Sequence, residues 1–214
     1  MKLVYVDNNA TTAVAPEVAE AMQPYLHESY FNPSSMYDPA RSVAHAIAGA
    51  RCSVAALIGL NSPSEVFFTS GATESNNWAI FGAIRANPQR RHIITTAVEH
   101  PSVLETCKEA ARRGLDVTFL PVDRDGQLNS DEFVRALRPD TLLVSIMHAN
   151  NETGVLFPIA ELARLAKETD PAILVHTDAT QSVGKVPLDL NGAWQHVDLL
   201  SLSGHKLHAP KGVG

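Results

Sequence analysis

The 214-residue chain alternates between short apolar runs and longer stretches in which apolar residues have helical spacing. The apolar runs show no polar alternation, which predicts strands that are buried on both faces. Six such runs are VFFT (66–69), HIITT (92–96), VTFLPV (117–122), TLLVSIMH (141–148), ILVHTD (173–178) and VDLLSLS (197–203).

Between these runs, apolar residues recur every three or four positions, as they do on one face of a helix. Helices are predicted from residue 16 and over 40–58, 101–113, 130–137 and 158–168, and another should follow residues 70–77. Strands that alternate with helices predict an α/β fold in three layers, a mainly parallel sheet with helices on both faces. Ligands of such sheets bind beyond the carboxyl ends of the strands, so those ends are where functional residues are expected.

Composition narrows the class of protein. The chain is 45% hydrophobic, and its 17 basic and 23 acidic residues give a net charge of −6 without a basic run, so nucleic acid is not an expected partner. The sequence shows no signal peptide and no apolar run long enough to cross a bilayer, which predicts a cytoplasmic protein without membrane contact. Cys52 and Cys107 are too few for a disulfide framework or a zinc site, and both are expected to be buried thiols in helices.

The first strand end carries a candidate anion site. Ser70 and Gly71 precede Ala72 and Thr73 at the start of a predicted helix. Small residues at a helix N-terminus expose backbone N–H groups, and the helix dipole favours negative charge there. An ordinary helix cap is the alternative explanation. The glycine spacing fits neither the dinucleotide fingerprint nor a Walker loop.

Other strand ends add polar side chains. His100, Asn151, Asp178, Gln181, Ser203, His205 and Lys206 all follow or end predicted strands. Asp178 should be partly buried and should therefore need a cationic partner. Together the set matches the needs of pyridoxal 5'-phosphate (PLP), whose phosphate, ring nitrogen, phenolic oxygen, ring face and aldehyde each require a different partner. A lysine that condenses with the aldehyde needs a pKa below the ordinary ~10.4.

Seven segments in order along the chain resemble one enzyme family. They are DNNATT (7–12), NPSS (32–35), FTSGATESNN (68–77), VEHPSVL (98–104), NNETG (150–154), HTDATQSVGKVP (176–187) and SGHKLHAPKGVG (203–214). Together they resemble the class V, fold-type-I PLP enzymes, and most closely the cysteine desulfurases of the nitrogen-fixation (NifS-type) branch. The resemblance implies that residues 16–214 form the PLP-binding large domain, incomplete at the C-terminus. It also implies that residues 1–15 belong with the small domain.

The resemblance also implies a role for each site residue. Lys206 would form the Schiff base with PLP, and Asp178 would pair with the ring nitrogen. His100 would stack on the ring and handle protons, while Gln181 would bond the phenolic oxygen. Asn151 would lie near the ring and the substrate. The phosphate would be bound by Ala72, Thr73, Ser203 and His205.

The implied reaction converts L-cysteine to L-alanine and passes persulfide sulfur to an iron–sulfur scaffold protein, with the full-length enzyme as a homodimer. The family's sulfur-accepting cysteine and substrate-binding arginine are expected downstream of this chain. We therefore expect an N-terminal portion of a desulfurase that does not turn over cysteine by itself.

Three alternatives stay open at this point. Another class V enzyme, such as a selenocysteine lyase or an aminotransferase, would share most of the cofactor residues. The chain would otherwise be an inactive PLP-binding fragment, or a catalytically inactive partner or scaffold that folds but never acquires the colour of the cofactor. A metal-binding protein would instead use His176, Asp178, His205 and His208. That alternative explains neither the candidate anion site at Thr73 nor the presence of Gln181.

Overall fold

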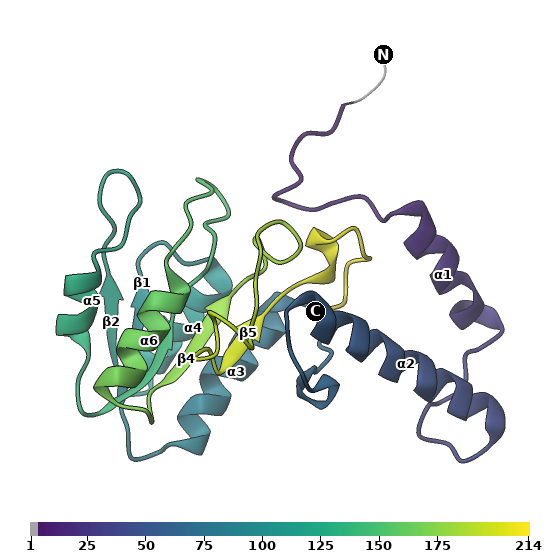
Figure 1. Cartoon of the computed structure of the whole chain (residues 1–214), viewed down its shortest axis with the longest axis horizontal. Coiled ribbons are helices and arrows are strands. Elements are labelled where there is room, and N and C mark those ends of the chain that lie inside the picture. Colours follow the sequence, from purple (N-terminus) through teal and green to yellow (C-terminus); the bar gives the residue numbers. More distant parts are fainter. Residues whose placement is uncertain (1–3) are drawn as a thin grey trace.

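A computed structural model describes residues 4–214 and shows a central sheet with helices on both sides (Figure 1). The α-helices are α1 (Pro16–His27), α2 (Asp38–Leu57), α3 (Ala72–Ala86), α4 (Pro101–Arg112), α5 (Ser130–Ala136) and α6 (Ile159–Thr169). The strands are β1 (His92–Thr96), β2 (Asp116–Leu120), β3 (Thr141–Ser145), β4 (Leu174–Asp178) and β5 (Leu199–Ser201). Two 3-10 turns complete the set, η1 (Pro63–Glu65) and η2 (Gly204–Lys206).

The sheet is five-stranded, in the order β2-β1-β3-β4-β5, and every pair of neighbours is parallel. Parallel neighbours place all carboxyl ends at one edge of the sheet, which is where the predicted site residues were expected. The α/β class and the parallel sheet predicted from the apolar runs are confirmed.

Helices cover both faces of the sheet. Adjacent residues of a strand point to opposite sides, so an apolar strand presents apolar side chains to both layers of helices. On β1, Ile94 packs into a core with Phe133 of α5 and Leu162 of α6. Its neighbour Ile93 packs into a second core, formed with Ile80 of α3 and other residues of α3 and α4. Both isoleucines are fully buried, which explains the absence of polar alternation in this strand.

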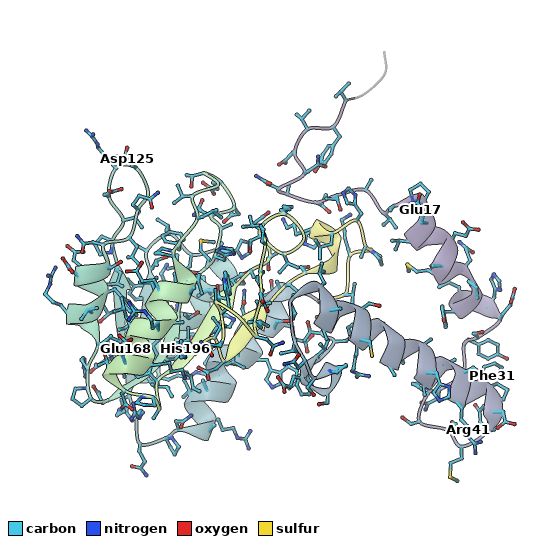
Figure 2. The ribbon with its side chains drawn as sticks, viewed as in Figure 1. Glu17, Phe31, Arg41, Asp125, Glu168 and His196 are labelled. Atoms are coloured by element: carbon cyan, nitrogen blue, oxygen red, sulfur yellow. The ribbon has the colours of Figure 1, made fainter. Side chains whose placement is uncertain are left out.

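Helices α1 and α2 extend away from the sheet as an arm (Figure 1). Phe31 and Arg41 lie at its far end, opposite the end of the molecule that carries Asp125 and Glu168 (Figure 2). Helix α1 contains no buried residue. The C-terminal end of α2 is anchored through Ile58, which packs in a small cluster with Ala179 and Val183.

Two expectations were wrong. Residues 66–69 form no strand, and Phe67 and Phe68 are 64% and 40% exposed. Apolar residues do not make a strand without a neighbouring ladder, and only Thr69 forms such bonds, from its N–H and C=O to Gly214 at 2.8 and 2.9 Å. Cys52 is exposed on α2, whereas Cys107 is buried as expected. The Ala-rich pattern of α2 does not distinguish its covered face, because little of the chain packs on this helix.

Across residues 4–214, every helix is too short or too polar to span a bilayer. Residues 9–15 make hydrogen bonds to the loop of residues 203–208, and a boundary between a small and a large domain after residue 15 stays a prediction.

Candidate active site

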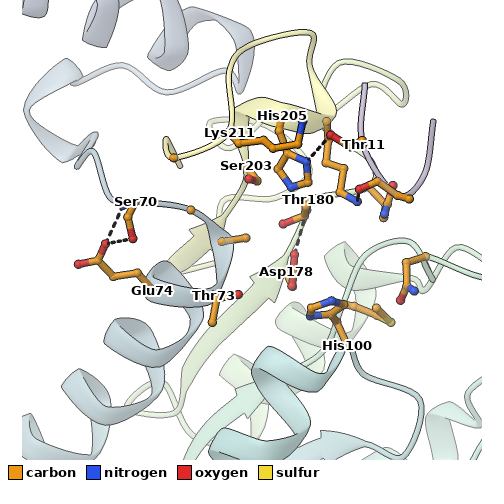
Figure 3. Close-up of a pocket in the computed structure, with 18 of the residues that line it drawn as sticks. Thr11, Ser70, Thr73, Glu74, His100, Asp178, Thr180, Ser203, His205 and Lys211 are labelled. Carbon is orange, nitrogen blue, oxygen red and sulfur yellow. Dashed lines mark hydrogen bonds between the residues drawn. The ribbon is translucent and has the colours of Figure 1, made fainter. Parts of the chain in front are cut away.

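A cavity of about 600 Å³ opens at the carboxyl ends of the strands (Figure 3). Its lining contains all nine residues predicted for the site, which are Ala72, Thr73, His100, Asn151, Asp178, Gln181, Ser203, His205 and Lys206. The volume suits a ligand the size of a cofactor. The structure thus brings together residues that lie far apart in the sequence, while their roles toward a ligand stay predictions.

The N-terminus of α3 forms one wall. Gly71 precedes the helix with a φ of +151°, a conformation that favours glycine. The backbone N–H groups of Ala72 and Thr73 have no hydrogen-bond acceptor among the described residues. The Glu74 carboxylate turns back to accept from the N–H and hydroxyl of Ser70, at 2.6 and 2.7 Å. The free N–H groups and the helix dipole therefore favour an anion at this wall.

Asp178 ends β4 and is 6% exposed. Its Oδ2 accepts from Asn76 Nδ2 at 2.7 Å, and its Oδ1 accepts from the Thr180 N–H at 3.0 Å. No side chain among residues 4–214 supplies the expected cationic partner, since none of their ion pairs includes Asp178. His176 on the same strand does not serve, because complete burial lowers its pKa to about 4. A ligand that brings a positive charge would supply what this carboxylate lacks.

His100 caps the N-terminus of α4. Its Nδ1 accepts from the Ser102 N–H at 3.2 Å and lies 2.8 Å from the Ser102 hydroxyl. The ring lies beside the cavity, below Asp178 in the view of Figure 3. Proline at the first helical position follows His100 because that position needs no N–H donor.

Lys206 lies in η2, just after β5, and Nζ donates to the carbonyl of Ala10 at 2.8 Å and to that of Asn9. Partial burial lowers the pKa of Lys206, and the positive charge of Lys185 lowers it further. The carboxylates of Asp7 and Asp178 oppose this shift. An amine with a lowered pKa is uncharged more often near neutral pH and is a better nucleophile.

Ser203 and His205, which precede Lys206, and Gln181, which follows β4, complete this wall. Ser203 is buried, and His205 Nδ1 lies 3.0 Å from the Thr11 hydroxyl. Partial burial lowers the pKa of His205, and the charges of Lys206 and Lys211 act in the same direction. Gln181 Nε2 donates to the Asn9 carbonyl at 2.9 Å.

Several site residues were not predicted from the sequence, among them two pairs that hold other site residues in place. Ala10 and Thr11 line the cavity although they lie almost 200 positions before Lys206. Asn76 is fully buried and Ser102 is 8% exposed, and both contact predicted site residues. A buried asparagine in mid-helix is the one available signal, because amides are uncommon in apolar helix faces unless a polar partner faces them.

The residues that line the cavity suit PLP better than they suit a metal ion. The part of the chain that the structure describes contains no group of three His, Cys, Asp or Glu residues able to hold a metal. His208 Nδ1 instead lies 3.1 Å from the Ala13 carbonyl, and His176 lies between the hydroxyls of Ser145 and Ser201. PLP fits better, since the lining offers free N–H groups, a carboxylate without a cation, an amine and a buried Thr180 hydroxyl that has no partner among the described residues.

A model of the aminotransferase class-V family matches residues 4–214. The chain belongs to this family. Class-V aminotransferases and the cysteine desulfurases among them depend on PLP. PLP is therefore the cofactor of the family to which this chain belongs.

Among the relatives, cysteine desulfurase NifS of Azotobacter vinelandii is 51% identical over 211 residues, which is 99% of this chain and 52% of that protein. Cysteine desulfurase IscS of Methanosarcina thermophila is 49% identical over 214 residues, covering 100% of this chain and 52% of that protein. The class-V chain therefore spans about half the length of the curated relatives it matches.

Solved structures agree. A NifS-like protein superposes with a TM-score of 0.95 at 43% identity, over 99% of this chain and 57% of its own. SspA in complex with cysteine superposes with a TM-score of 0.94 at 41% identity, over 99% of this chain and 60% of its own. These neighbours confirm the fold-type-I architecture of the PLP enzymes for the part of the fold that this class-V chain contains.

Proposed function

We propose that this chain forms the cofactor-binding part of a PLP-dependent cysteine desulfurase. The observation that carries the proposal is the single cavity that gathers a lysine with a lowered pKa, a buried carboxylate without a cation and a helix N-terminus with free N–H groups. The desulfurase names of relatives about half identical to the chain support the reaction class.

Bound PLP supplies an aldehyde that condenses with amines and a ring that withdraws electrons. Lys206 would provide the amine, and Asp178 would hold the protonated ring nitrogen by an ion pair. The phosphate would lie against the N–H groups of Ala72 and Thr73, with Ser203 and His205 beside it. His100 would stack on the ring, Gln181 would bond the phenolic oxygen, and Asn151 would face ring and substrate.

The substrate in this proposal is L-cysteine, which becomes L-alanine as its sulfur passes to a thiol as a persulfide. Nζ of Lys206 would be the base for the substrate Cα proton, because it is the amine on the cavity wall whose pKa is lowered. One solved neighbour holds cysteine, which supports this substrate class.

Neither cysteine of the chain suits the role of sulfur acceptor. Cys52 and Cys107 are absent from the residues that line the cavity. Burial and the negative charge of Glu99 raise the pKa of Cys107 to about 12, which leaves an unreactive thiol. We propose that the acceptor is another thiol, and that an iron–sulfur scaffold protein receives the sulfur.

A homodimer of the longer enzyme is part of the proposal. Helix α1 supports it, because it buries no residue and leaves Tyr25 and Leu26 46% and 66% exposed. Sedimentation velocity of the 214-residue chain measures whether this part already self-associates.

The experiment for the reaction class adds L-cysteine, D-cysteine or L-alanine to the PLP-loaded chain and records absorbance, sulfide and alanine. We expect a fast spectral change with L-cysteine that D-cysteine does not produce, without catalytic release of sulfide. Equal responses to both enantiomers would contradict the assigned substrate. Sulfide released over many turnovers would contradict the claim that the chain holds no acceptor thiol in its cavity.

A further inference from the structure

A continuous line of hydrogen bonds joins His100 to Asp178. His100 Nδ1 lies 2.8 Å from the Ser102 hydroxyl, Asn76 Nδ2 donates to the same hydroxyl at 2.8 Å, and Asn76 Nδ2 also donates to Asp178 Oδ2 at 2.7 Å. Asn76 lies on α3 and Ser102 on α4, so two helices packed on one face of the sheet connect two cavity walls.

The direction of each bond follows from the ends of the line. A carboxylate offers only acceptor atoms, so the Asn76 amide must present Nδ2 and not Oδ1 to Asp178. Its second Nδ2 hydrogen then points to the Ser102 oxygen. Asn76 Oδ1 is left buried with no partner among the described residues. An apolar residue would avoid this unsatisfied acceptor, so the amide is a poor choice for packing alone.

The Ser102 hydroxyl continues the line of hydrogen bonds from Asn76 to His100. Its oxygen accepts from Asn76, and its hydrogen is therefore available to His100 Nδ1. The Ser102 backbone N–H also donates to His100 Nδ1, at 3.2 Å. Two donors that converge on Nδ1 require a lone pair there, which places the proton of the neutral ring on Nε2.

We propose that Asn76 and Ser102 are positioning residues that fix the His100 proton on Nε2 and orient its ring together with the Asp178 carboxylate. The significance of this unit for catalysis rests on the proposed PLP site, in which both ends would contact the cofactor ring. The tautomer itself belongs to the protein without cofactor, so it can be measured independently of that site.

The test is two-dimensional ¹H–¹⁵N NMR of the histidine-labelled chain without PLP, at a pH where the rings are neutral. Long-range correlations distinguish a protonated from an unprotonated ring nitrogen, and the signal lost in His100→Gln identifies His100. We expect an unprotonated Nδ1 and a protonated Nε2 in the wild type. Asn76→Ala and Ser102→Ala should both shift the averaged Nδ1 signal toward the protonated value.

The matched control is Asn87→Ala, which removes an amide from the other end of α3 that bonds the Ala83 carbonyl. It should leave the His100 signals in place. A protonated Nδ1 in the wild type would overturn the proposal, and so would unchanged signals in both Asn76→Ala and Ser102→Ala. Circular dichroism checks folding, and Ser102→Ala decides the matter if Asn76→Ala does not fold.

A second readout separates this proposal from the proposed function. If the chain binds PLP, Asn76→Ala should weaken that binding roughly ten-fold, because Asp178 loses a hydrogen bond to a charged group. A chain that shows the expected tautomer but binds no PLP would overturn the proposed function and leave the positioning unit standing.

Discussion

At the residue scale, the reactivity of Lys206 depends on its electrostatic surroundings. Partial burial and the nearby Lys185 lower its pKa, whereas Asp7 and Asp178 raise it. Lys185 is linked to the same group of atoms, since its Nζ lies 3.4 Å from Gln181 Oε1 and Gln181 bonds the Asn9 carbonyl that Lys206 also contacts. Lys185 therefore lowers the pKa of the Lys206 amine without contacting that amine directly.

Replacing Lys185 by methionine should raise the pKa of Lys206, because a neighbouring positive charge is removed while the aliphatic stem stays. A smaller fraction of Lys206 is then uncharged near pH 8, and condensation with PLP should be about two- to five-fold slower there. The rate of condensation is measured by stopped-flow absorbance between about pH 7 and 10, a range that approaches the ordinary pKa of lysine. Its pH profile should move to higher pH, and Lys108→Met, at an exposed position of α4, is the control. A profile that matches the wild type would contradict the role of Lys185.

All nine site residues predicted from the sequence line the cavity, because strand ends of a parallel sheet converge at one edge. The sequence did not predict what holds Asp178. Burial of the carboxylate suggested a cation, whereas the partner that the structure shows within the protein is the Asn76 amide. Which face of α3 meets the end of β4 depends on helix packing, which residue spacing does not reveal.

At the element scale, the N-terminal segment fastens the turn that carries Lys206. Thr12 donates from its N–H and its hydroxyl to the His205 carbonyl, each at 2.9 Å, and its hydroxyl oxygen accepts from the His208 N–H at 2.9 Å. The Ala15 N–H donates to the His208 carbonyl at 2.9 Å. His208 has a φ of 60°, uncommon for a residue other than glycine, and these bonds hold it in place.

Thr12→Val keeps the side-chain shape but removes both bonds of the hydroxyl. It should destabilise the chain by about 1–3 kcal/mol, because two part-buried hydrogen bonds are lost and the His208 N–H loses its acceptor. Hydrogen exchange of the peptide over residues 203–214 should become faster, as measured by mass spectrometry. Thr12→Ser keeps the hydroxyl and should exchange like the wild type. Equal protection in Thr12→Val would show that the segment does not restrain the turn.

Glu99 connects the ends of β1 and β3. Its Oε1 accepts from the Thr96 hydroxyl at 2.8 Å and from the Met147 N–H at 3.0 Å. Burial raises its pKa from 4.5 to about 8. The folded state therefore binds a proton that the unfolded state has released, so stability is lost as pH rises from 4.5 to 8.

Glu99→Gln removes this titration. The wild type should lose of the order of a few kcal/mol relative to the variant as pH rises through this range, because ionisation of the buried carboxyl is unfavourable. Urea unfolding at about pH 5, 6.5 and 8 measures the difference in free energy of unfolding between the wild type and the variant. Glu152→Gln, at an exposed position, is the control. A difference between wild type and Glu99→Gln that does not change with pH would refute the assignment.

The elements themselves were largely predictable, since long periodic segments fix their own type. Residues 66–69 were the exception. Their composition is that of a buried strand, yet strand formation depends on a partner, and the described residues pair only Thr69. An isolated apolar run carries no information about its neighbour.

At the scale of the whole molecule, the arm of α1 and α2 extends from the sheet and the helices that cover it (Figure 1). The site lies where the sheet edge, the N-terminus of α3 and residues 10–11 meet. No local stretch of sequence contains this site, because its parts come from both ends of the chain. The central claim is that this arrangement is a PLP site built around Lys206.

The most direct test mixes the 214-residue chain with PLP and records its visible spectrum, followed by borohydride reduction and peptide mapping. The account predicts a new absorbance band in the wild type and its loss in Lys206→Ala. It also predicts that the reduced cofactor is attached to the peptide that contains Lys206. No spectral change, or the same band and a label on another lysine in Lys206→Ala, would contradict it.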